Sequence, residues 1–253
     1  MTPKTAIVVP CYNEELRLDR AAFERFLDDE GRYLRMIFVD DGSRDKTLEV
    51  LNGIRSGRED RVTVLANPSN RGKAESVRLG VCHAFAEGFE FAGFWDADLA
   101  TPLEVIPEFS AILETRTDLH MVFGSRVKLL GRHVERKASR HYIGRVFATC
   151  VSIILRIPIY DSQCGAKIFR SNELTRAAFG EPFFSRWVFD VEILARYQRG
   201  CSSVEEAARR IYEFPLMRWA DIGGSKLKGK DFVAAAGDLV RIFLTFRPDR
   251  LKQ

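Results

Sequence analysis

Short apolar runs alternate with longer amphipathic segments through the first half of the chain. The runs are continuous in apolar residues, as is typical of strands buried on both faces of a sheet, and they lie at residues 5–9, 34–39, 62–65, 91–95 and 121–124. Segments with apolar residues at helical spacing lie between them, at residues 20–28, 45–54, 73–87 and 103–114. Strands that alternate with helices predict a mostly parallel sheet with right-handed crossovers.

The second half of the chain has a different pattern. Helical spacing predicts helices at residues 136–156, 187–197 and 231–246. A short strand is expected at 166–169, and we also interpret the ambiguous segment 211–219 as a strand. No linker or repeat separates the two halves, so we expect a single α/β domain over residues 1–253.

Polar side chains follow three of the predicted strands at the point where each strand ends. These segments are Pro10-Cys11-Tyr12-Asn13-Glu14, Asp40-Asp41-Gly42-Ser43 and Asp96-Ala97-Asp98. The carboxyl ends of parallel strands meet at one edge of the sheet, where ligands of such sheets bind. Asp and Ser are also common as helix caps and in turns, a role that fits Ser43 and Asp45 equally well. Three acid-bearing ends at one edge are harder to explain by capping, and they predict a ligand site.

Asp96 and Asp98 lie two residues apart, directly after a buried strand. In an extended turn, such a pair can hold one hard divalent cation, Mg²⁺ or Mn²⁺, through carboxylate oxygens. The cation would bridge the two phosphates of a nucleoside diphosphate and neutralise the charge that develops on the leaving group. The pair therefore predicts a site for the diphosphate of a nucleotide-sugar.

Several segments between Val8 and Lys226 match a known family: Val8-Val9-Pro10-Cys11-Tyr12-Asn13-Glu14, Val39-Asp40-Asp41-Gly42-Ser43-Arg44-Asp45, Asn70-Arg71-Gly72-Lys73, Asp96-Ala97-Asp98, Gly124-Ser125-Arg126, Asp161-Ser162-Gln163-Cys164-Gly165-Ala166-Lys167, Arg186-Trp187-Val188-Phe189-Asp190-Val191-Glu192, Trp219-Ala220-Asp221 and Gly223-Gly224-Ser225-Lys226. In these segments the chain resembles the family 2 glycosyltransferases of the GT-A fold. Within that family it is similar to the dolichyl- or polyprenyl-phosphate glucosyltransferases and mannosyltransferases, with the glucosyl branch closer. The resemblance implies a Rossmann-like sheet flanked by helices, with acceptor-side helices at the C-terminal end. It also implies a nucleotide-sugar-binding half at 1–125 and an acceptor-binding half at 126–253.

The resemblance further implies roles for individual residues. The nucleotide-sugar would be bound by Pro10, Tyr12, Glu14, Asp40, Asp41, Lys73, Asp96, Ala97 and Asp98. The metal would be held by Asp96, Asp98 and Gln163. Asp161 and Gln163 would face the sugar or the reacting centre, and with Asp96 and Asp98 they form the expected catalytic set. An exposed lysine at the start of a helix is the alternative interpretation of Lys73.

Basic residues gather between Arg126 and Arg145, where seven Lys or Arg accompany a single acid, Glu135. Such a cluster suggests binding to phosphate or to an anionic membrane surface. Arginine suits phosphate oxygens because of its forked geometry, and the expected ligands of an acceptor phosphate are Arg126, Arg136, Ser139 and Arg140. A solvated helix face explains the last three equally well. Together with the resemblance, the cluster predicts a polyprenyl or dolichyl phosphate acceptor.

Composition adds limits on partners and location. The net charge of +4 is too small to indicate nucleic acid. The five cysteines are odd in number and lack CxxC spacing, which argues against a disulfide framework or a zinc site and for a reducing compartment. We see no apolar leader, and no apolar run approaches the ~20 residues that span a bilayer. We expect a cytoplasmic protein that associates peripherally with the cytoplasmic face of a membrane through helices 136–156 and 231–246.

The leading hypothesis is an inverting, metal-dependent transfer of glucose from UDP-glucose to a polyprenyl phosphate. A phosphate acceptor is already ionised near neutrality, whereas a sugar or protein hydroxyl would need a general base, for which Asp190 or Asp161 is the first candidate. Asp190 and Glu192 are equally interpretable as structural partners of Arg186. A nucleotidyltransferase is a more distant alternative, because the glycine-rich loop of that class is absent after the first strand; a non-catalytic binding module is another. The sequence leaves open whether the transferred sugar is glucose or mannose and whether the donor nucleotide is UDP or GDP.

Overall fold

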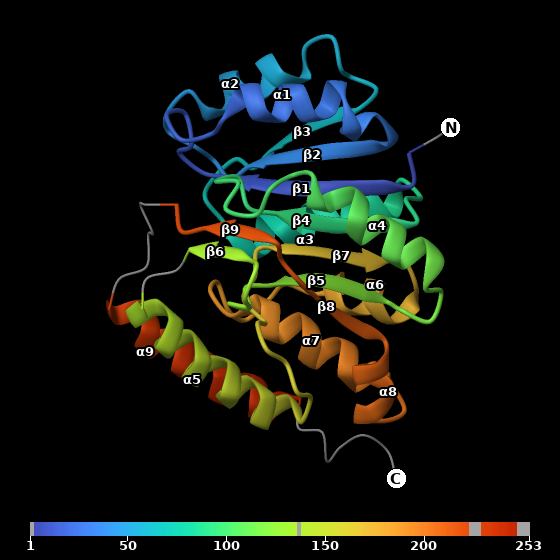
Figure 1. The fold of residues 1–253 in the computed structure, drawn as a ribbon. Coiled ribbons are helices and arrows are strands. Elements are labelled where there is room, and N and C mark those ends of the chain that lie inside the picture. The colour runs from blue at the N-terminus through green and yellow to red at the C-terminus, as the bar shows by residue number, and fades with distance from the viewer. Residues whose placement is uncertain (1–2, 136–137, 223–228, 247–253) are drawn as a thin grey trace.

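A seven-stranded sheet forms the centre of the protein (Figure 1). The structure is a computed structural model that describes residues 3–135, 138–222 and 229–246. The strand order is β3-β2-β1-β4-β7-β5-β8, and the bounds are β1 Thr5–Cys11, β2 Leu34–Asp40, β3 Val62–Ala66, β4 Phe91–Trp95, β5 Met121–Ser125, β7 Ala166–Arg170 and β8 Ile211–Pro215. The strands predicted in the first half of the chain are confirmed.

Strand β7 runs in the opposite direction to its two neighbours. It is antiparallel to β4 and β5, whereas the other neighbouring strands of the sheet pair in parallel. The prediction of a mostly parallel sheet is therefore confirmed, but the insertion of β7 between β4 and β5 was not predicted. Because of this direction, Ala166 at the start of β7 pairs with Trp95 at the end of β4. The segment that leads into β7 thus reaches the edge where the parallel strands end.

Helices cover both faces of this sheet. Along β1, Ala6 and Val8 enter one core while Ile7 and Val9 enter the other, as expected of a strand buried on both faces. The Ile7 face is covered by α1 Arg20–Asp28, α2 Thr47–Arg55 and α4 Val105–Thr115. The Ala6 face is covered by α3 Lys73–Ala86, α6 Glu173–Gly180, α7 Phe189–Gly200 and α8 Val204–Arg209. The one-turn helix η1 Glu30–Tyr33 precedes β2.

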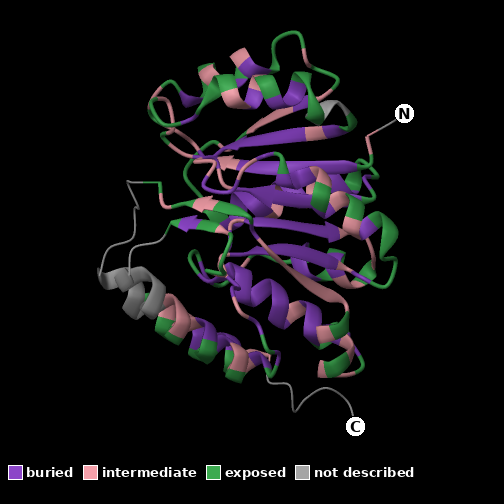
Figure 2. Ribbon diagram, in the orientation of Figure 1, coloured by how far each residue is buried: buried purple, intermediate pink, exposed green. Residues whose placement is uncertain are grey.

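Two long helices, α5 Ala138–Leu155 and α9 Gly229–Thr245, lie side by side outside the main sheet (Figure 1). They contact each other and α7, and exposed positions alternate with half-buried and buried ones along α5 (Figure 2). A small parallel sheet, β6 His133–Glu135 with β9 Arg218–Ala220, lies nearby. The strand predicted at 211–219 is therefore two strands, β8 and β9, in different sheets. Across the described ranges, we find no helix with the length and apolar character needed to span a membrane.

A polar cluster lies at the amino end of β5. The Nδ1 atom of His120 is 2.7 Å from the Tyr197 hydroxyl, and its Nε2 atom is 2.9 Å from Nη1 of Arg210. A guanidinium can only donate, so Nε2 must accept, and the neutral ring carries its proton on Nδ1. Burial, together with the charges of Arg210 and Arg170, lowers the pKa of His120 to about 4. The folded protein therefore holds this imidazole neutral at pH values where an unfolded chain would protonate it.

The free energy of unfolding should fall on acidification through this histidine. Between pH ~6.5, the ordinary histidine pKa, and about 4, its pKa in the fold, the unfolded state binds the extra proton. The loss should reach about 2 kcal/mol at the lower end of this range, after discounting for partial exposure. Urea unfolding at pH 7.5 and 4.5 measures it. Carboxylates also titrate in this range, so His120→Asn serves as the reference; equal losses in both proteins would contradict the prediction.

Candidate active site

Asp96 is held at the end of β4 by the segment that leads into β7. Its backbone N–H donates to the carbonyl of Gly165 at 2.9 Å. A Cβ atom on residue 165 would lie 1.9 Å from Oδ2 of Asp96, so any residue larger than glycine would displace the carboxylate. Gly165, in the sequence Gln163-Cys164-Gly165, therefore leaves the space that the Asp96 carboxylate occupies.

Lys73, at the first position of α3, reaches the same carboxylate. Its Nζ atom lies 2.5 Å from Oδ1 of Asp96, and both side chains remain partly exposed. Loss of water around the amine would lower the pKa of Lys73, but the nearby carboxylates of Asp96, Asp190 and Asp98 outweigh that effect and raise it. The amine is therefore a fixed positive charge beside the acidic pair. This contact goes beyond the alternative interpretation, in which Lys73 is only an exposed lysine at the start of a helix.

Asp98 lies beside Asp96 in a less polar setting. Its Oδ1 atom accepts a hydrogen bond from the N–H of Ala100 at 3.1 Å. Burial, and then the charge of Asp96, raise the pKa of Asp98. Two ionised carboxylates that repel each other across a short turn are stabilised by a cation that both of them bind. The donor set therefore fits a hard divalent ion.

The protein supplies only part of a metal coordination shell at this place. The described ranges contain no group of three or more His, Cys, Asp or Glu side chains arranged to hold a metal. Mg²⁺ is commonly bound through one or two carboxylates together with phosphate oxygens and water. Gln163 adds an amide, whose buried Nε2 atom has no hydrogen-bond partner among the described residues. A cation here would therefore depend on the diphosphate for its remaining ligands.

The two neighbouring acids Asp40 and Asp41 differ in their contacts. Asp41 accepts from the N–H groups of Arg71 and Gly72 and from the amide of Asn67, at 2.7 to 2.9 Å. It therefore holds the loop that leads to Lys73. Asp40 receives one long hydrogen bond, from the N–H of Ser43 at 3.4 Å, and its Oδ1 atom is buried with no partner among the described residues. Asp40, rather than Asp41, has the acceptor atom that a nucleobase or ribose could use.

Hydrogen bonds connect the loop after β1 to the segment after β2. The N–H of Asn13 donates to the Ser43 hydroxyl at 3.0 Å, and the N–H of Glu14 donates to the Thr47 hydroxyl at 2.7 Å. Pro10, near the end of β1, and Tyr12, in the loop that follows, are both half-buried. The structure thus brings the first and second predicted segments together at one edge, and the end of β1 lies between Asp40 at the end of β2 and the acidic pair after β4.

Arg126 and Asp161 form a buried, two-pronged ion pair. Nε and Nη2 of Arg126 lie 2.6 and 2.7 Å from the Asp161 oxygens, and the Arg126 N–H also donates to this carboxylate at 3.1 Å. The guanidinium lies over the Trp219 ring, 5.2 Å from its centroid. Burial would lower the pKa of Arg126, but the Asp161 carboxylate outweighs it and raises it. The predicted phosphate ligand Arg126 is therefore already bound to the predicted catalytic residue Asp161.

A family model described as "Glycosyl transferase family 2" matches residues 6–171, which contain the acidic pair, Lys73 and Asp161. The chain belongs to glycosyltransferase family 2. The predicted family is thereby confirmed, and the protein is a glycosyltransferase.

Curated relatives of this glycosyltransferase lie in the branch that the motifs indicated. A dolichyl-phosphate beta-glucosyltransferase of Trichomonas vaginalis is 32% identical, over 96% of this chain and 72% of its own. Enzymes of the same name from Dictyostelium discoideum and Homo sapiens are 30% and 31% identical, over 94% and 89% of this chain and 73% and 70% of theirs. The predicted resemblance to dolichyl-phosphate glucosyltransferases is therefore confirmed.

Solved structures share the fold at lower identity. Glucosyl-3-phosphoglycerate synthase from Mycobacterium tuberculosis, in complex with Mn²⁺, UDP and glucosyl-3-phosphoglycerate, is 17% identical with a TM-score of 0.67, over 96% of this chain and 79% of that one. A mannosyltransferase from Pyrobaculum calidifontis, in complex with GDP-mannose and Mn²⁺, is 18% identical with a TM-score of 0.61, over 97% and 64%. These likenesses confirm the GT-A fold.

Two charged residues near the site, the buried Lys167 and the half-buried Glu213, were not singled out from the sequence. Lys167, inside β7, donates to the Cys164 carbonyl at 2.6 Å and to the Asp190 carboxylate. Glu213, in β8, accepts from the N–H groups of Tyr160 and Asp161 at 2.8 to 3.0 Å, and burial raises its pKa. Both residues hold the segment that carries Asp161 and Gln163. Their partners lie on other elements, so no local sequence pattern marks them.

The structural interpretation of Asp190 and Glu192 is right, but the expected partner is wrong. Asp190 pairs with Lys167, and Glu192 pairs with Arg196 at 2.6 Å. Arg186 instead lies against Gly72, at the start of α3. Because Asp190 is buried against a lysine, it is poorly placed to act as a general base.

The remaining predicted acceptor ligands lie outside the part of the chain whose side chains the structure describes. Arg136 lies outside the described residues, and so do the side chains of Ser139 and Arg140 on α5.

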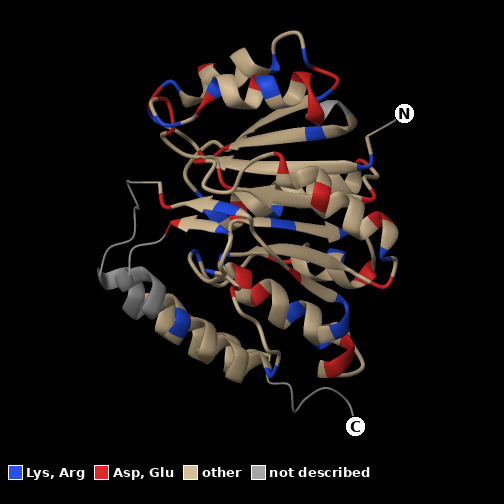
Figure 3. Ribbon diagram, viewed as in Figure 1, with Lys and Arg blue, Asp and Glu red and all other residues tan. Residues whose placement is uncertain are grey.

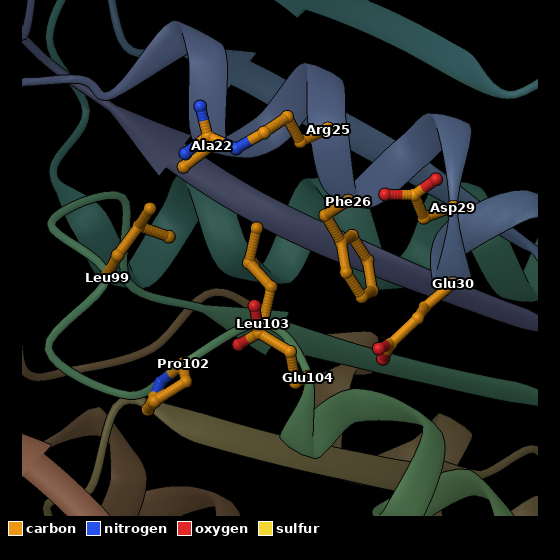
Figure 4. Close-up of a pocket in the computed structure, with 9 residues that line it drawn as sticks. All are labelled: Ala22, Arg25, Phe26, Asp29, Glu30, Leu99, Pro102, Leu103 and Glu104. Carbon is orange, nitrogen blue, oxygen red and sulfur yellow. The ribbon is translucent and has the colours of Figure 1, made fainter.

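A surface hollow opens near the site, between α1 and the loop after Asp98 (Figure 4). The residues that line it are Ala22, Arg25, Phe26, Asp29, Glu30, Leu99, Pro102, Leu103 and Glu104. It contains none of the predicted site residues, so the acidic edge is a separate place.

Proposed function

We propose that this glycosyltransferase transfers glucose from UDP-glucose to a polyprenyl or dolichyl phosphate, with inversion at the anomeric carbon. The observation that carries the proposal is the acidic pair Asp96 and Asp98 facing Lys73 at the end of β4. The similarity to dolichyl-phosphate beta-glucosyltransferases supports glucose and a lipid phosphate. The Mn²⁺ and UDP of the similar synthase support the donor and the metal.

The donor would lie along the acidic edge. A divalent cation, Mg²⁺ or Mn²⁺, held by Asp96 and Asp98 with Gln163 as a third candidate, would neutralise the charge that develops on the diphosphate. The Lys73 ammonium, fixed beside Asp96, supplies a second positive charge at the same place. Asp40, together with Pro10 of β1 and Tyr12 and Glu14 of the loop after it, would bind the base and ribose. In this proposal, residues 1–125 form the half of the domain that binds the nucleotide-sugar donor.

The acceptor would approach from residues 126–253. One oxygen of its ionised phosphate attacks the anomeric carbon, the bond from that carbon to the diphosphate oxygen breaks, and UDP leaves with the electron pair. No proton has to be removed from such an acceptor near neutrality, so positioning and electrostatics provide the rate enhancement. The engagement of Asp161 with Arg126 and of Asp190 with Lys167 agrees with a reaction that needs no strong base.

A donor screen tests this function. The enzyme, with Mn²⁺ and a short polyprenyl phosphate, is offered radiolabelled UDP-glucose and GDP-mannose in separate reactions. We expect label in the organic phase and release of UDP with UDP-glucose alone. Label that stays in the aqueous phase on an added sugar or peptide would favour a hydroxyl acceptor. Release of pyrophosphate would indicate a nucleotidyltransferase, and tight UDP binding without turnover would indicate a binding module.

The acceptor also suggests a location. A polyprenyl phosphate resides in a membrane with its phosphate at the surface, so we propose that the enzyme works peripherally at the cytoplasmic face. The helical pair α5 and α9 offers apolar side chains for such contact, since Val146, Ile153, Val240 and Leu244 are each more than half exposed. Such helices can lie in the membrane interface.

A further inference from the structure

The turn between β5 and β6 carries two leucines whose side chains face solvent. Leu130 is fully exposed, at 104%, and Leu129 is 48% exposed. Met217 lies next to this turn, because its carbonyl accepts from the N–H of His133 at 2.9 Å, and it is 52% exposed. Large apolar side chains that gather at the surface mark a site of interaction.

Hydrogen bonds hold this turn in one shape. The N–H of Arg132 donates to the Leu129 carbonyl at 3.2 Å, which closes a four-residue turn. Gly131 has φ +79°, the left-handed value that the third position of a type II turn requires. The Arg132 side chain donates to the carbonyl of Pro215, at the end of β8. The two leucines are therefore presented by a braced turn, so little conformational entropy is lost when they bind.

The charges around this turn suit an anionic surface. Lys128 directly precedes Leu129, Arg218 pairs with His133 just after the turn, and both basic residues are exposed. Residues 126–134 contain no Asp or Glu. Glu135 ends β6 and Asp221 follows β9, so both acids lie at the end of the small sheet away from the turn. Figure 3 shows the basic and acidic positions along the ribbon. An apolar tip with basic flanks is the composition of segments that enter the headgroup region of anionic membranes.

The turn is continuous with the candidate active site. Arg126, the residue after β5, binds Asp161 and lies over Trp219 of β9. The exposed Leu130 follows only four residues later. A lipid surface that takes up Leu130 would therefore lie close to the edge where the proposed acceptor phosphate must enter.

We propose that residues 129–132 dock the enzyme on a lipid bilayer, with Leu129 and Leu130 inserted at the level of the headgroups. The turn then sets the height of the active-site edge above the membrane. This inference rests on the proposed function for the identity of the acceptor, while the binding of lipid itself is a separate property. It names a contact distinct from the helical pair α5 and α9.

Flotation with vesicles of phosphatidylcholine and phosphatidylserine tests the turn. The intact protein is expected to float with the vesicles, and the Leu129→Ser/Leu130→Ser protein should bind at least about tenfold more weakly, since two apolar side chains no longer leave water. Tyr33→Ser is the matched control, because Tyr33 is 61% exposed and precedes β2, which is separated from β5 by three strands of the sheet. It should bind like the unaltered protein.

Three results would overturn the proposal: no flotation of the unaltered protein, equal flotation of the double variant, or a loss seen only in Val240→Ser/Leu244→Ser of α9. Transfer to a water-soluble short-chain acceptor without vesicles separates this inference from the proposed function. We expect the double variant to keep that activity. An unaltered protein that floats but transfers no sugar would contradict the proposed function and leave the docking turn standing.

Discussion

Replacing Asp98 with alanine is expected to abolish sugar transfer in a protein that stays folded. Asp98 shares its turn with Asp96, and burial, followed by the charge of Asp96, raises the pKa of Asp98, so its ionised form is disfavoured in the fold. A cation bound to the diphosphate would remove that penalty. Loss of one of the two carboxylates should lower kcat by roughly 10³-fold, the scale seen when a preorganised electrostatic group is removed from an active site.

The same pKa shift predicts the effect on stability. A carboxyl group whose pKa is raised in the fold destabilises the folded state at neutral pH, because the unfolded chain ionises it more easily. Asp98→Ala should therefore unfold in urea at the same midpoint as the unaltered protein, or slightly later. Asp118→Ala, at an exposed acid just before β5 and so at the opposite end of the strands from the acidic pair, is the control for transfer. Near-normal turnover of the Asp98 variant would falsify the metal assignment.

A second measurement separates binding from turnover in this variant. Mn²⁺ binding in the presence of UDP, followed by the electron paramagnetic resonance of the ion, should weaken in Asp98→Ala and stay unchanged in Asp118→Ala. Inactivity with unchanged Mn²⁺ binding would leave Asp98 important but assign it another role.

The strand ends were predictable because their signal is local. A continuous apolar run such as Val8-Val9 followed by polar residues marks both the strand and its exit, and parallel order brings such exits to one edge. The direction of β7 was not predictable in this way. Its run, Ala166–Arg170, indicates a strand, but its place between β4 and β5 depends on pairing with residues far away in the chain. The short α6 was missed although its capping residues, Asn172 and Thr175, are visible in the sequence.

The polar residues of the site illustrate the same limit. The motif around Asp40 and Asp41 identifies both acids, but only the fold reveals that Asp41 is used by the loop before Lys73. Arg126 and Asp161 were assigned separate roles, because 35 residues separate them and nothing local indicates that they meet. Sequence therefore finds the residues that carry charge, while the fold decides which charges are already paired.

Breaking the Arg126–Asp161 pair should have the largest effect on stability. Replacing Arg126 with methionine leaves the buried Asp161 carboxylate without its guanidinium, a loss that typically costs about 3–5 kcal/mol when the partner stays buried. Urea unfolding of Arg126→Met at pH 7.5 measures it. Arg196→Met, which breaks the buried pair with Glu192 on α7, is a matched control away from the acidic edge. It should lose similar stability.

The double variant Arg126→Met/Asp161→Leu distinguishes a structural pair from a functional one. Two apolar residues of similar volume often replace a buried ion pair at little net cost, so the double variant should recover most of the stability that the single variant loses. If the pair orients the acceptor or the sugar, transfer by the double variant should stay at least about tenfold below that of the unaltered protein. The control variant Arg196→Met should transfer sugar at the rate of the unaltered protein when both are assayed at a temperature where the variant is folded. Recovery of both stability and transfer would mean that the ion pair serves only the fold, and that the phosphate of the acceptor is bound by other residues of the acceptor half.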